Sequence, residues 1–172
     1  MCCYGASIEY TDGNRNVYAI MGGVPEYGNF AWLTIIHEFN HSLANWLIYK
    51  NMEAFRESGE KIFPSIKDIL ADQAYGNWET MMCEALVRAG EIKHLIDNNF
   101  EQSKIENKIK SEKERGFFWM EELVDELESY DKQRDIYLTL ESYMPKLIET
   151  YNIWAEKFRQ TRYDTNERMP NA

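Results

Sequence analysis

The sequence predicts a mainly α fold with a small antiparallel β element at its N-terminal end. Turn residues separate two short β-rich runs before residue 21, which indicates a hairpin. After residue 28, several long segments repeat apolar residues at helical spacing. No internal repeat or low-complexity linker divides the 172 residues, so we expect one domain with a real hydrophobic core.

The first predicted element is the β-hairpin, over residues 7–21. Residues 7–10 alternate between the two faces of a strand, residues 11–14 (Thr-Asp-Gly-Asn) supply turn chemistry, and residues 17–20 (Val-Tyr-Ala-Ile) are β-rich. The run Gly22-Gly23-Val24-Pro25 closes the hairpin. We therefore assign residues 1–28 to a hairpin and a loop.

A long helix is predicted from Asn29 or Phe30 to Lys50. Asn29 is a suitable N-cap residue, because its side chain can accept a hydrogen bond from the first turn. Apolar side chains occupy most of the circumference of this helix, so we expect it to be the central one.

The rest of the chain reads as further helices. A polar segment covers residues 56–61, and Pro64 is well placed to open a short helix through residue 74. Gly76 and Asn77 end that helix and cap the next one, over residues 78–97. We expect a charged, solvated helix over 101–115, a helix over 117–130, and another over 134–158 that is interrupted or restarted near Pro145. The single domain thus comprises metal-site helices at 29–98, C-terminal helices at 99–160 and a flexible tail at 161–172.

Charge and apolar patterning exclude some classes of function. The formal net charge is −10, which argues against a nucleic-acid partner because such a protein needs a basic face. No stretch approaches the roughly 20 apolar residues of a membrane span, and no charged-then-apolar leader opens the chain. We therefore expect a soluble protein of open localisation, in which Cys83 is a buried thiol.

The strongest functional signal is His37-Glu38-Phe39-Asn40-His41 within the long apolar helix. Each helical residue advances about 100°, so the two imidazoles lie one turn apart and can reach one metal ion. Glu38 points elsewhere on the helix, where it can reach a water bound to that metal. The ligand types favour zinc, one ion per chain.

A chance occurrence of the motif is the alternative. The chain has three histidines, and two of them fall in the motif. The flanking residues 34–36 and 42–44 are uncharged, so an unliganded His-Glu-His group in this helix would carry a desolvation cost. The pattern therefore favours a metal site.

The segment from Thr34 to Leu43 resembles the active-site helix of the zincin metallopeptidases. The residues after His41 lack the glycine and third histidine of the metzincin extension, so the resemblance is to a gluzincin-like arrangement. More narrowly, residues 27–95 resemble an uncharacterised bacterial family of predicted metallopeptidases, over less than half of the chain. The resemblance implies a zincin-like helical domain in which a glutamate on a later helix completes the site.

Glu84 is our choice for that third ligand. It is a carboxylate within the apolar run 81–87, where a metal ion would remove the desolvation cost of its burial. An ion pair with Arg88, four residues further on, is the structural alternative. Glu79 is the main rival as a ligand, and His94 reads as an ordinary surface histidine.

The expected reaction is hydrolysis of a peptide or protein substrate by a metal-bound water. Glu38 would act as general base and then protonate the leaving amine. A second donor must stabilise the oxyanion, and Tyr137 is the first choice. Tyr143, Arg88 and Arg134 are the other candidates for this donor.

The zincin resemblance also implies a strand along which the substrate lies. The β-rich run before the site helix could play this part, with Tyr18, Ala19 and Ile20 as substrate-binding residues. An ordinary hairpin that covers the core is the alternative.

Two other classes of function stay open on the sequence. The first is a metal-binding domain without catalytic activity, suggested by the short β element. The second is a helical interaction module, suggested by the charged stretch 101–115 and by the aromatic run 117–119.

Overall fold

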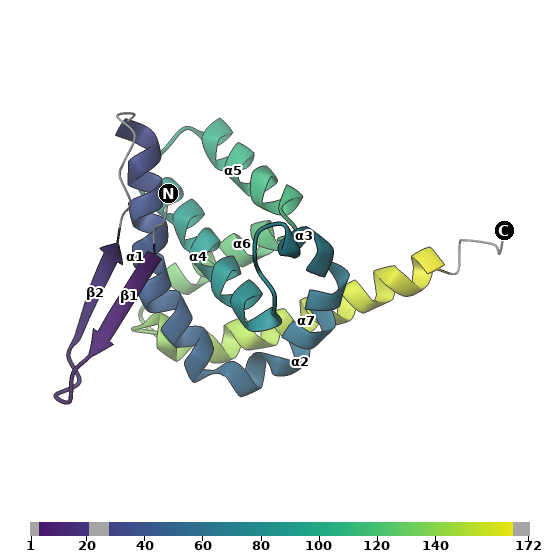
Figure 1. Ribbon diagram of the computed structural model, residues 1–172, viewed down its shortest axis with the longest axis horizontal. Coiled ribbons are helices and arrows are strands. Elements are labelled where there is room, and N and C mark those ends of the chain that lie inside the picture. The colour runs from purple at the N-terminus through teal and green to yellow at the C-terminus, as the bar shows by residue number, and fades with distance from the viewer. Residues whose placement is uncertain (1–3, 21–27, 167–172) are drawn as a thin grey trace.

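A computed structural model describes residues 4–20 and 28–166 of the protein (Figure 1). These residues are mainly helical, which confirms the predicted fold class. The strands are β1 (Tyr4–Glu9) and β2 (Arg15–Ile20). The helices are α1 (Gly28–Lys50), α2 (Met52–Ile62), the 3-10 helix η1 (Phe63–Ser65), α3 (Lys67–Ala71), α4 (Trp78–Asp97), α5 (Gln102–Glu114), α6 (Met120–Asp131) and α7 (Leu140–Asn166).

The predicted hairpin is confirmed. β1 and β2 pair antiparallel, in a register that runs from Tyr4 opposite Ile20 to Glu9 opposite Arg15. The turn between them places Gly13 at a φ of 83°, a left-handed conformation that glycine adopts without steric cost. Among the described residues the two strands form a two-stranded sheet, in which each strand has one edge without a strand partner.

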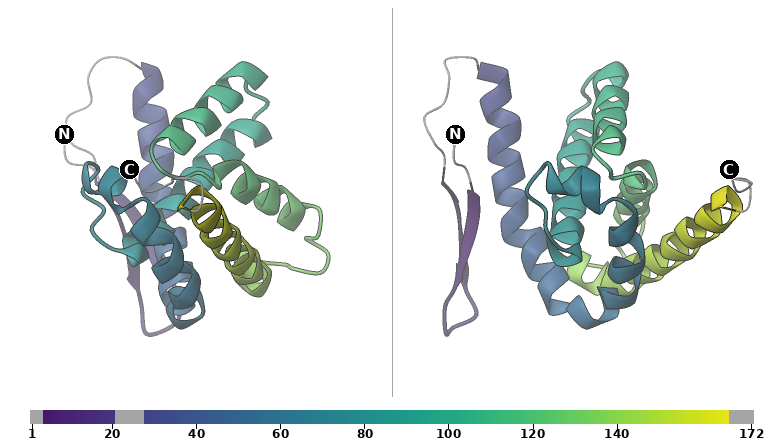
Figure 2. Two further views of the ribbon diagram at one scale, coloured as in Figure 1. Left: turned by 90° about the vertical axis from the view of Figure 1, so that its right-hand side faces the viewer. Right: turned by 45° about the vertical axis from the view of Figure 1, so that its right-hand side comes forward.

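The central helix is α4, not the first long helix as the sequence analysis expected. α4 packs against α1, α2, α5 and α6 and is buried along most of its length. α1 lies between α4 on one side and the hairpin on the other (Figures 1 and 2). Its third face is open, with Trp32, Phe39 and Leu43 between 43% and 53% exposed. The apolar circumference of α1 therefore reflects two packed faces and one exposed apolar face.

α2 was not predicted, because its buried face is made partly of small residues. Phe55, Ser58, Gly59 and Ile62 are its buried residues, at helical spacing, but two of the four do not register as apolar in a sequence pattern. A Cβ atom on Gly59 would lie 2.3 Å from the Trp78 ring. The absence of a side chain there allows α2 to approach α4.

The remaining helices follow the prediction with shifted ends. Asn29 lies inside the first turn of α1 and not at its N-cap, because the helix begins at Gly28. The short helix expected from Pro64 is divided into η1 and α3. α7 begins at Leu140 and not at Arg134, and it runs through Pro145 without interruption. Hydrogen bonds between Thr139 and Ser142 cap its first turn.

The C-terminal part of the chain is more helical than expected. α7 continues to Asn166, although the sequence predicts a helix only to residue 158 and a flexible tail from residue 161. Residues 167–172 of the predicted flexible tail lie outside the described residues. Among the described helices, none is both long and apolar enough to cross a membrane. Cys83 is a free, buried thiol, as expected.

Candidate metal centre

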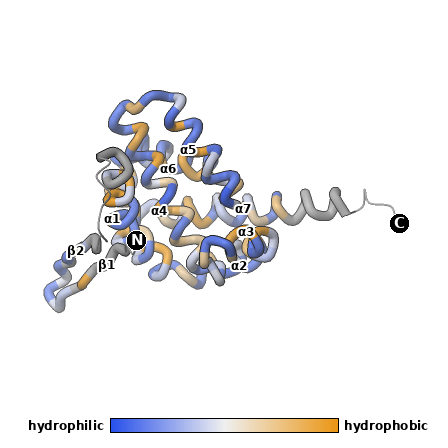
Figure 3. Tube along the Cα trace, turned by 45° about the horizontal axis from the view of Figure 1, so that its top comes forward, coloured by the Kyte–Doolittle hydropathy of each residue, from blue (hydrophilic) through white to orange (hydrophobic). Residues whose placement is uncertain are grey.

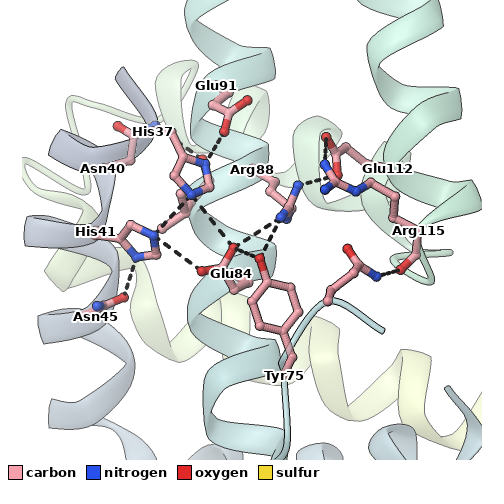
Figure 4. Close-up of polar contacts among 12 residues, drawn as sticks. His37, Asn40, His41, Asn45, Tyr75, Glu84, Arg88, Glu91, Glu112 and Arg115 are labelled. Atoms are coloured by element: carbon pink, nitrogen blue, oxygen red, sulfur yellow. Dashed lines mark hydrogen bonds and ion pairs between the residues drawn. The ribbon is translucent and has the colours of Figure 1, made fainter. Parts of the chain in front are cut away.

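α1 and α4 bring the three predicted ligands together. His37 and His41 extend from α1 toward α4, and Glu84 meets them from α4 (Figure 4). The Nε2 atoms of the two histidines are 3.1 Å apart. Glu84 places Oε1 3.3 Å from Nε2 of His41 and Oε2 3.9 Å from Nε2 of His37. One ligand atom from each residue thus lies within 4.8 Å of the others.

These separations fit a tetrahedral zinc site. Zinc–nitrogen and zinc–oxygen bonds of about 2.0–2.2 Å place neighbouring ligand atoms about 3.3–3.5 Å apart. From Nε2 of His41, the distances to Nε2 of His37 (3.1 Å) and to Oε1 of Glu84 (3.3 Å) are close to this ligand–ligand distance. The 3.9 Å distance between His37 Nε2 and Glu84 Oε2 needs a small movement of the carboxylate. The residues present therefore fit a divalent ion without rearrangement of the helices.

The outer nitrogens of both imidazoles bind protein acceptors. His37 Nδ1 contacts Oε1 of Glu91, and His41 Nδ1 lies 3.2 Å from Oδ1 of Asn45. A carboxylate and an amide oxygen accept hydrogen bonds, so each Nδ1 carries a proton and donates it. In the neutral imidazoles, each Nε2 then presents a lone pair to the other. Two lone pairs at 3.1 Å, beside a carboxylate, form a favourable position for a cation.

Close packing of α1 on α4 sets this geometry. The side chain of Asn40 donates a hydrogen bond of 3.2 Å to the carbonyl of Val87. A Cβ atom on Gly90 would lie 2.8 Å from Nδ2 of Asn40, so this glycine leaves room for the bridging amide. α4 begins where predicted, because the Asn77 side chain accepts a hydrogen bond from the Thr80 amide.

Glu84 is held by two further groups. The Tyr75 hydroxyl donates to its Oε2 at 2.9 Å, and Arg88 lies 3.3 Å from the same oxygen. Burial and the neighbouring Glu84 carboxylate raise the pKa of Tyr75, so the hydroxyl remains a donor. The Glu84 carboxylate therefore lies beside both histidines and also forms the predicted ion pair with Arg88.

The polar network continues from Arg88 into α5. Arg88 contacts Oε2 of Glu112 at 2.8 Å, and Lys108 lies 2.7 Å from Oε1 of Glu112 and 2.7 Å from Oε2 of Glu91. Burial raises the pKa of Glu91, but its bond with His37 and the charge of Lys108 outweigh burial. The pKa of Glu91 therefore lies below its ordinary value.

Buried charged groups line the centre. The carboxylates of Glu84, Glu91 and Glu112 are buried there and contact the cations of Arg88 and Lys108, and Arg115 lies 3.9 Å from Glu112. A divalent cation beside Glu84 would be stabilised by these carboxylates.

Solvent reaches the centre. The side chains of His37 and His41 are 21% and 16% exposed, although Glu84 is 8% exposed. Glu38 follows His37 on the helix and is itself buried. Within the described residues its Oε2 atom has no hydrogen-bond partner, so one buried carboxylate oxygen of the residue after His37 can still accept a proton or a hydrogen bond.

The other predicted ligands lie elsewhere. Glu79 is not part of the cluster; its charge acts on Tyr49 and Cys83. His94 contacts Asn98 and lies beside the Trp32 ring, with ring centroids 6.3 Å apart, toward the end of α4.

Of the predicted oxyanion donors, the structure brings Arg88 alone to the centre. The Tyr137 ring packs edge-on against Tyr143, with centroids 5.0 Å apart. The Tyr143 hydroxyl donates to Glu126. Arg134 lies over the Tyr130 ring. Tyr143 belongs to α7, and Tyr137 and Arg134 lie in the segment between α6 and α7.

The predicted substrate strand is β2, which lies along α1 with its partner β1. Tyr18 is 42% exposed, and its hydroxyl accepts a hydrogen bond from the Asn16 side chain. Ala19 and Ile20 belong to the same strand, but their side chains lie outside what the structure describes.

Four residues that support the centre were not singled out from the sequence. Tyr75 lies in the connection before α4, a position without helical periodicity. Glu91 lies seven residues after Glu84, two helical turns further along one face, and this spacing could have identified it. Lys108 and Glu112 form an i, i+4 pair in a charged stretch that resembled a solvated surface.

The fold and its centre define a helical domain with a candidate His-His-Glu metal site. The chain belongs to a family described as a domain of unknown function, DUF4932, whose model matches residues 26–150. The matched region contains all three candidate ligands and the network behind them. No curated protein and no solved structure matches the chain.

Proposed function

We propose that this domain is a zinc-dependent peptidase of gluzincin-like design. The observation that carries the proposal is the approach of two imidazole Nε2 atoms to 3.1 Å beside the Glu84 carboxylate, while both Nδ1 atoms bind other groups. Two histidines and one carboxylate are a common ligand set of hydrolytic zinc sites, in which a fourth position stays open. The exposure of His37 and His41 to solvent is consistent with such a position.

Glu38 has the properties of a general base at this site. When bound, a divalent metal lowers the pKa of a coordinated water, which makes hydroxide available near neutral pH. Glu38 lies about 100° around α1 from His37 and about 60° from His41, so its carboxylate stays outside the ligand set. Its unpartnered oxygen can take a proton from the attacking water and return it to the leaving amine.

A peptide substrate is supported by the hairpin beside α1. Within the part of the chain that the structure describes, one edge of β2 has no strand partner, and an extended peptide can bind such an edge through main-chain hydrogen bonds. Tyr18 projects from this strand with much of its side chain accessible. The backbone of β2 would position the substrate, and α1 would supply the chemistry.

The proposal is tested first by metal content. Protein purified without added metal should contain about one zinc per chain by elemental analysis. His37→Ala, His41→Ala and Glu84→Ala should each lose that zinc, whereas Glu79→Ala should keep it. Full zinc content in Glu84→Ala would remove this residue from the ligand set.

Catalysis is tested separately with Glu38→Gln. This variant should retain zinc but lose chelator-sensitive cleavage of a peptide library by about 10²–10⁴-fold, the usual contribution of a general base. Zinc-loaded wild-type protein that cleaves no member of a broad library would reduce the domain to a non-catalytic metal-binding module.

A further inference from the structure

Lys108 of α5 occupies a position between two buried carboxylates that belong to different helices. Its ammonium lies 2.7 Å from Oε2 of Glu91 on α4 and 2.7 Å from Oε1 of Glu112 on α5. Glu91 is 3% exposed and Glu112 is fully buried. Two carboxylates at this depth carry a large desolvation cost unless a cation accompanies them, so Lys108 holds both in place.

The first of these carboxylates, Glu91, connects Lys108 to His37. The oxygen of Glu91 that Lys108 does not touch is bonded to His37 Nδ1. This bond fixes the proton on Nδ1 and turns Nε2 toward Glu84 and His41. The ammonium of Lys108 therefore sets the orientation of His37 through one intervening carboxylate.

The second carboxylate, Glu112, connects Lys108 through Arg88 to Glu84, the candidate carboxylate ligand. Oε2 of Glu112 lies 2.8 Å from one nitrogen of Arg88, and the other terminal nitrogen reaches Glu84 at 3.3 Å and the Tyr75 hydroxyl at 2.8 Å. The planar guanidinium has a rigid fork of donors, so its anchoring at Glu112 fixes the donors that face Glu84. Figure 4 shows this path from α5 across α4 to the centre.

We propose that Lys108 is a positioning residue for the metal centre, through which docking of α5 orients both His37 and Glu84. The inference rests on the proposed metal site. α5 is otherwise a mostly hydrophilic helix (Figure 3), whose buried residues are Ile105 and Glu112. Ile105 and Ile109 pack α5 against the core, and the ion pairs of Lys108 add a charged anchor behind the candidate ligands.

The test compares Lys108→Met with Lys110→Met. Methionine keeps the aliphatic length and removes the charge. Lys110 is a matched control because it lies on the same helix, is 76% exposed and lies 3.9 Å from Glu114. Zinc affinity is measured by competition with a chromophoric chelator, and ligand geometry is measured from the visible absorption of the cobalt-substituted protein. Loss of an outer-shell partner usually costs about 10–100-fold in metal affinity.

We expect Lys108→Met to weaken zinc binding within that range and to alter the cobalt spectrum, and Lys110→Met to change neither. Equal behaviour of the two variants would overturn the role of Lys108 while leaving the metal site intact. Wild-type protein that binds no zinc would instead overturn the proposed function. The two failures are therefore distinguishable.

A second variant keeps the inference testable if Lys108→Met disturbs folding. Glu91→Gln retains an acceptor for His37 but breaks the ion pair with Lys108. It should also weaken zinc binding, and the double variant should lose less affinity than the two single losses combined, because both residues act through one path. Circular dichroism checks that each variant is folded. If the losses of zinc affinity in the two folded single variants add up to the loss in the double variant, the shared path is contradicted.

Discussion

His37 and His41 show how single hydrogen bonds decide the chemistry of a site. Each ring has one nitrogen committed to an acceptor, so the other is left for the centre. The same imidazoles with Nε2 protonated would repel a cation. Glu91 and Asn45 therefore orient the candidate ligands that the histidine spacing brings together.

Tyr75 gives a prediction at this scale. Tyr75→Phe removes the donor to Glu84 and one partner of Arg88, so zinc affinity should fall by about tenfold or more. Competition with a chelator measures the change. Tyr137→Phe is the control: its ring packs on Tyr143, so the affinity should stay at the wild-type value. An unchanged affinity in Tyr75→Phe would show that Arg88 alone holds the carboxylate.

Cys83 gives a second prediction. Burial, with the nearby Glu84 charge, raises the pKa of this thiol to about 12, so at pH 8 it is almost entirely protonated. The thiolate is the reactive form, and we expect Cys83 to resist iodoacetamide in the native protein. Peptide mapping after alkylation, with and without urea, tests this. Rapid native labelling at Cys83 would mean that α4 opens readily at this point.

Much of the candidate centre could be predicted from residues alone. The i, i+4 histidines and the buried Glu84 each carry a local signal, one from helical geometry and one from desolvation. The supporting residues Tyr75 and Lys108 carry none, because their importance comes from contacts between segments distant in sequence. The choice of Tyr137 shows the same limit: hydroxyl chemistry identifies a candidate but not its location.

At the scale of elements, local signals predicted α4 well and α2 poorly. α4 has an N-cap at Asn77 and a long apolar stripe, and its predicted bounds agree with the structure. The buried face of α2 includes the small residues Ser58 and Gly59, which a hydrophobic pattern does not detect. That this face is buried becomes clear only from the contact between Gly59 and the Trp78 ring. The central place of α4 likewise depends on which helices pack together, a property of the tertiary fold.

Gly59→Ala is the prediction for this packing. Alanine normally stabilises a helix interior over glycine by roughly 0.5–1 kcal/mol. Here its Cβ would lie 2.3 Å from the buried Trp78 ring, so α2 must move and the protein should be destabilised by about 1–3 kcal/mol. Urea denaturation measures this. Glu60→Ala, at an exposed site on the same helix, should stay within about 0.5 kcal/mol of wild type. Stabilisation by Gly59→Ala would show that α2 is free to shift.

At the scale of the whole molecule, metal binding at the proposed site is linked to stability, because the ligands come together only in the folded state. Zinc at about 100 times its Kd should stabilise the fold by about 2.7 kcal/mol. For a chain of this size, that corresponds to a rise in Tm of about 5–10 °C. Thermal melts with zinc and with a chelator measure the difference. In His41→Ala the two melts should coincide; a persistent zinc effect there would place the ion at another site.

The bridge between α1 and α4 also has a consequence for kinetics. His37, His41 and Glu84 meet only after two helices distant in the chain have packed, so a bound ion stabilises the folded state more than the transition state for folding. Refolding would proceed at the same speed with or without the ion. Unfolding would be slowed, because the helices cannot separate until the ion is released, and the lifetime of the folded protein would follow the dissociation rate of its metal.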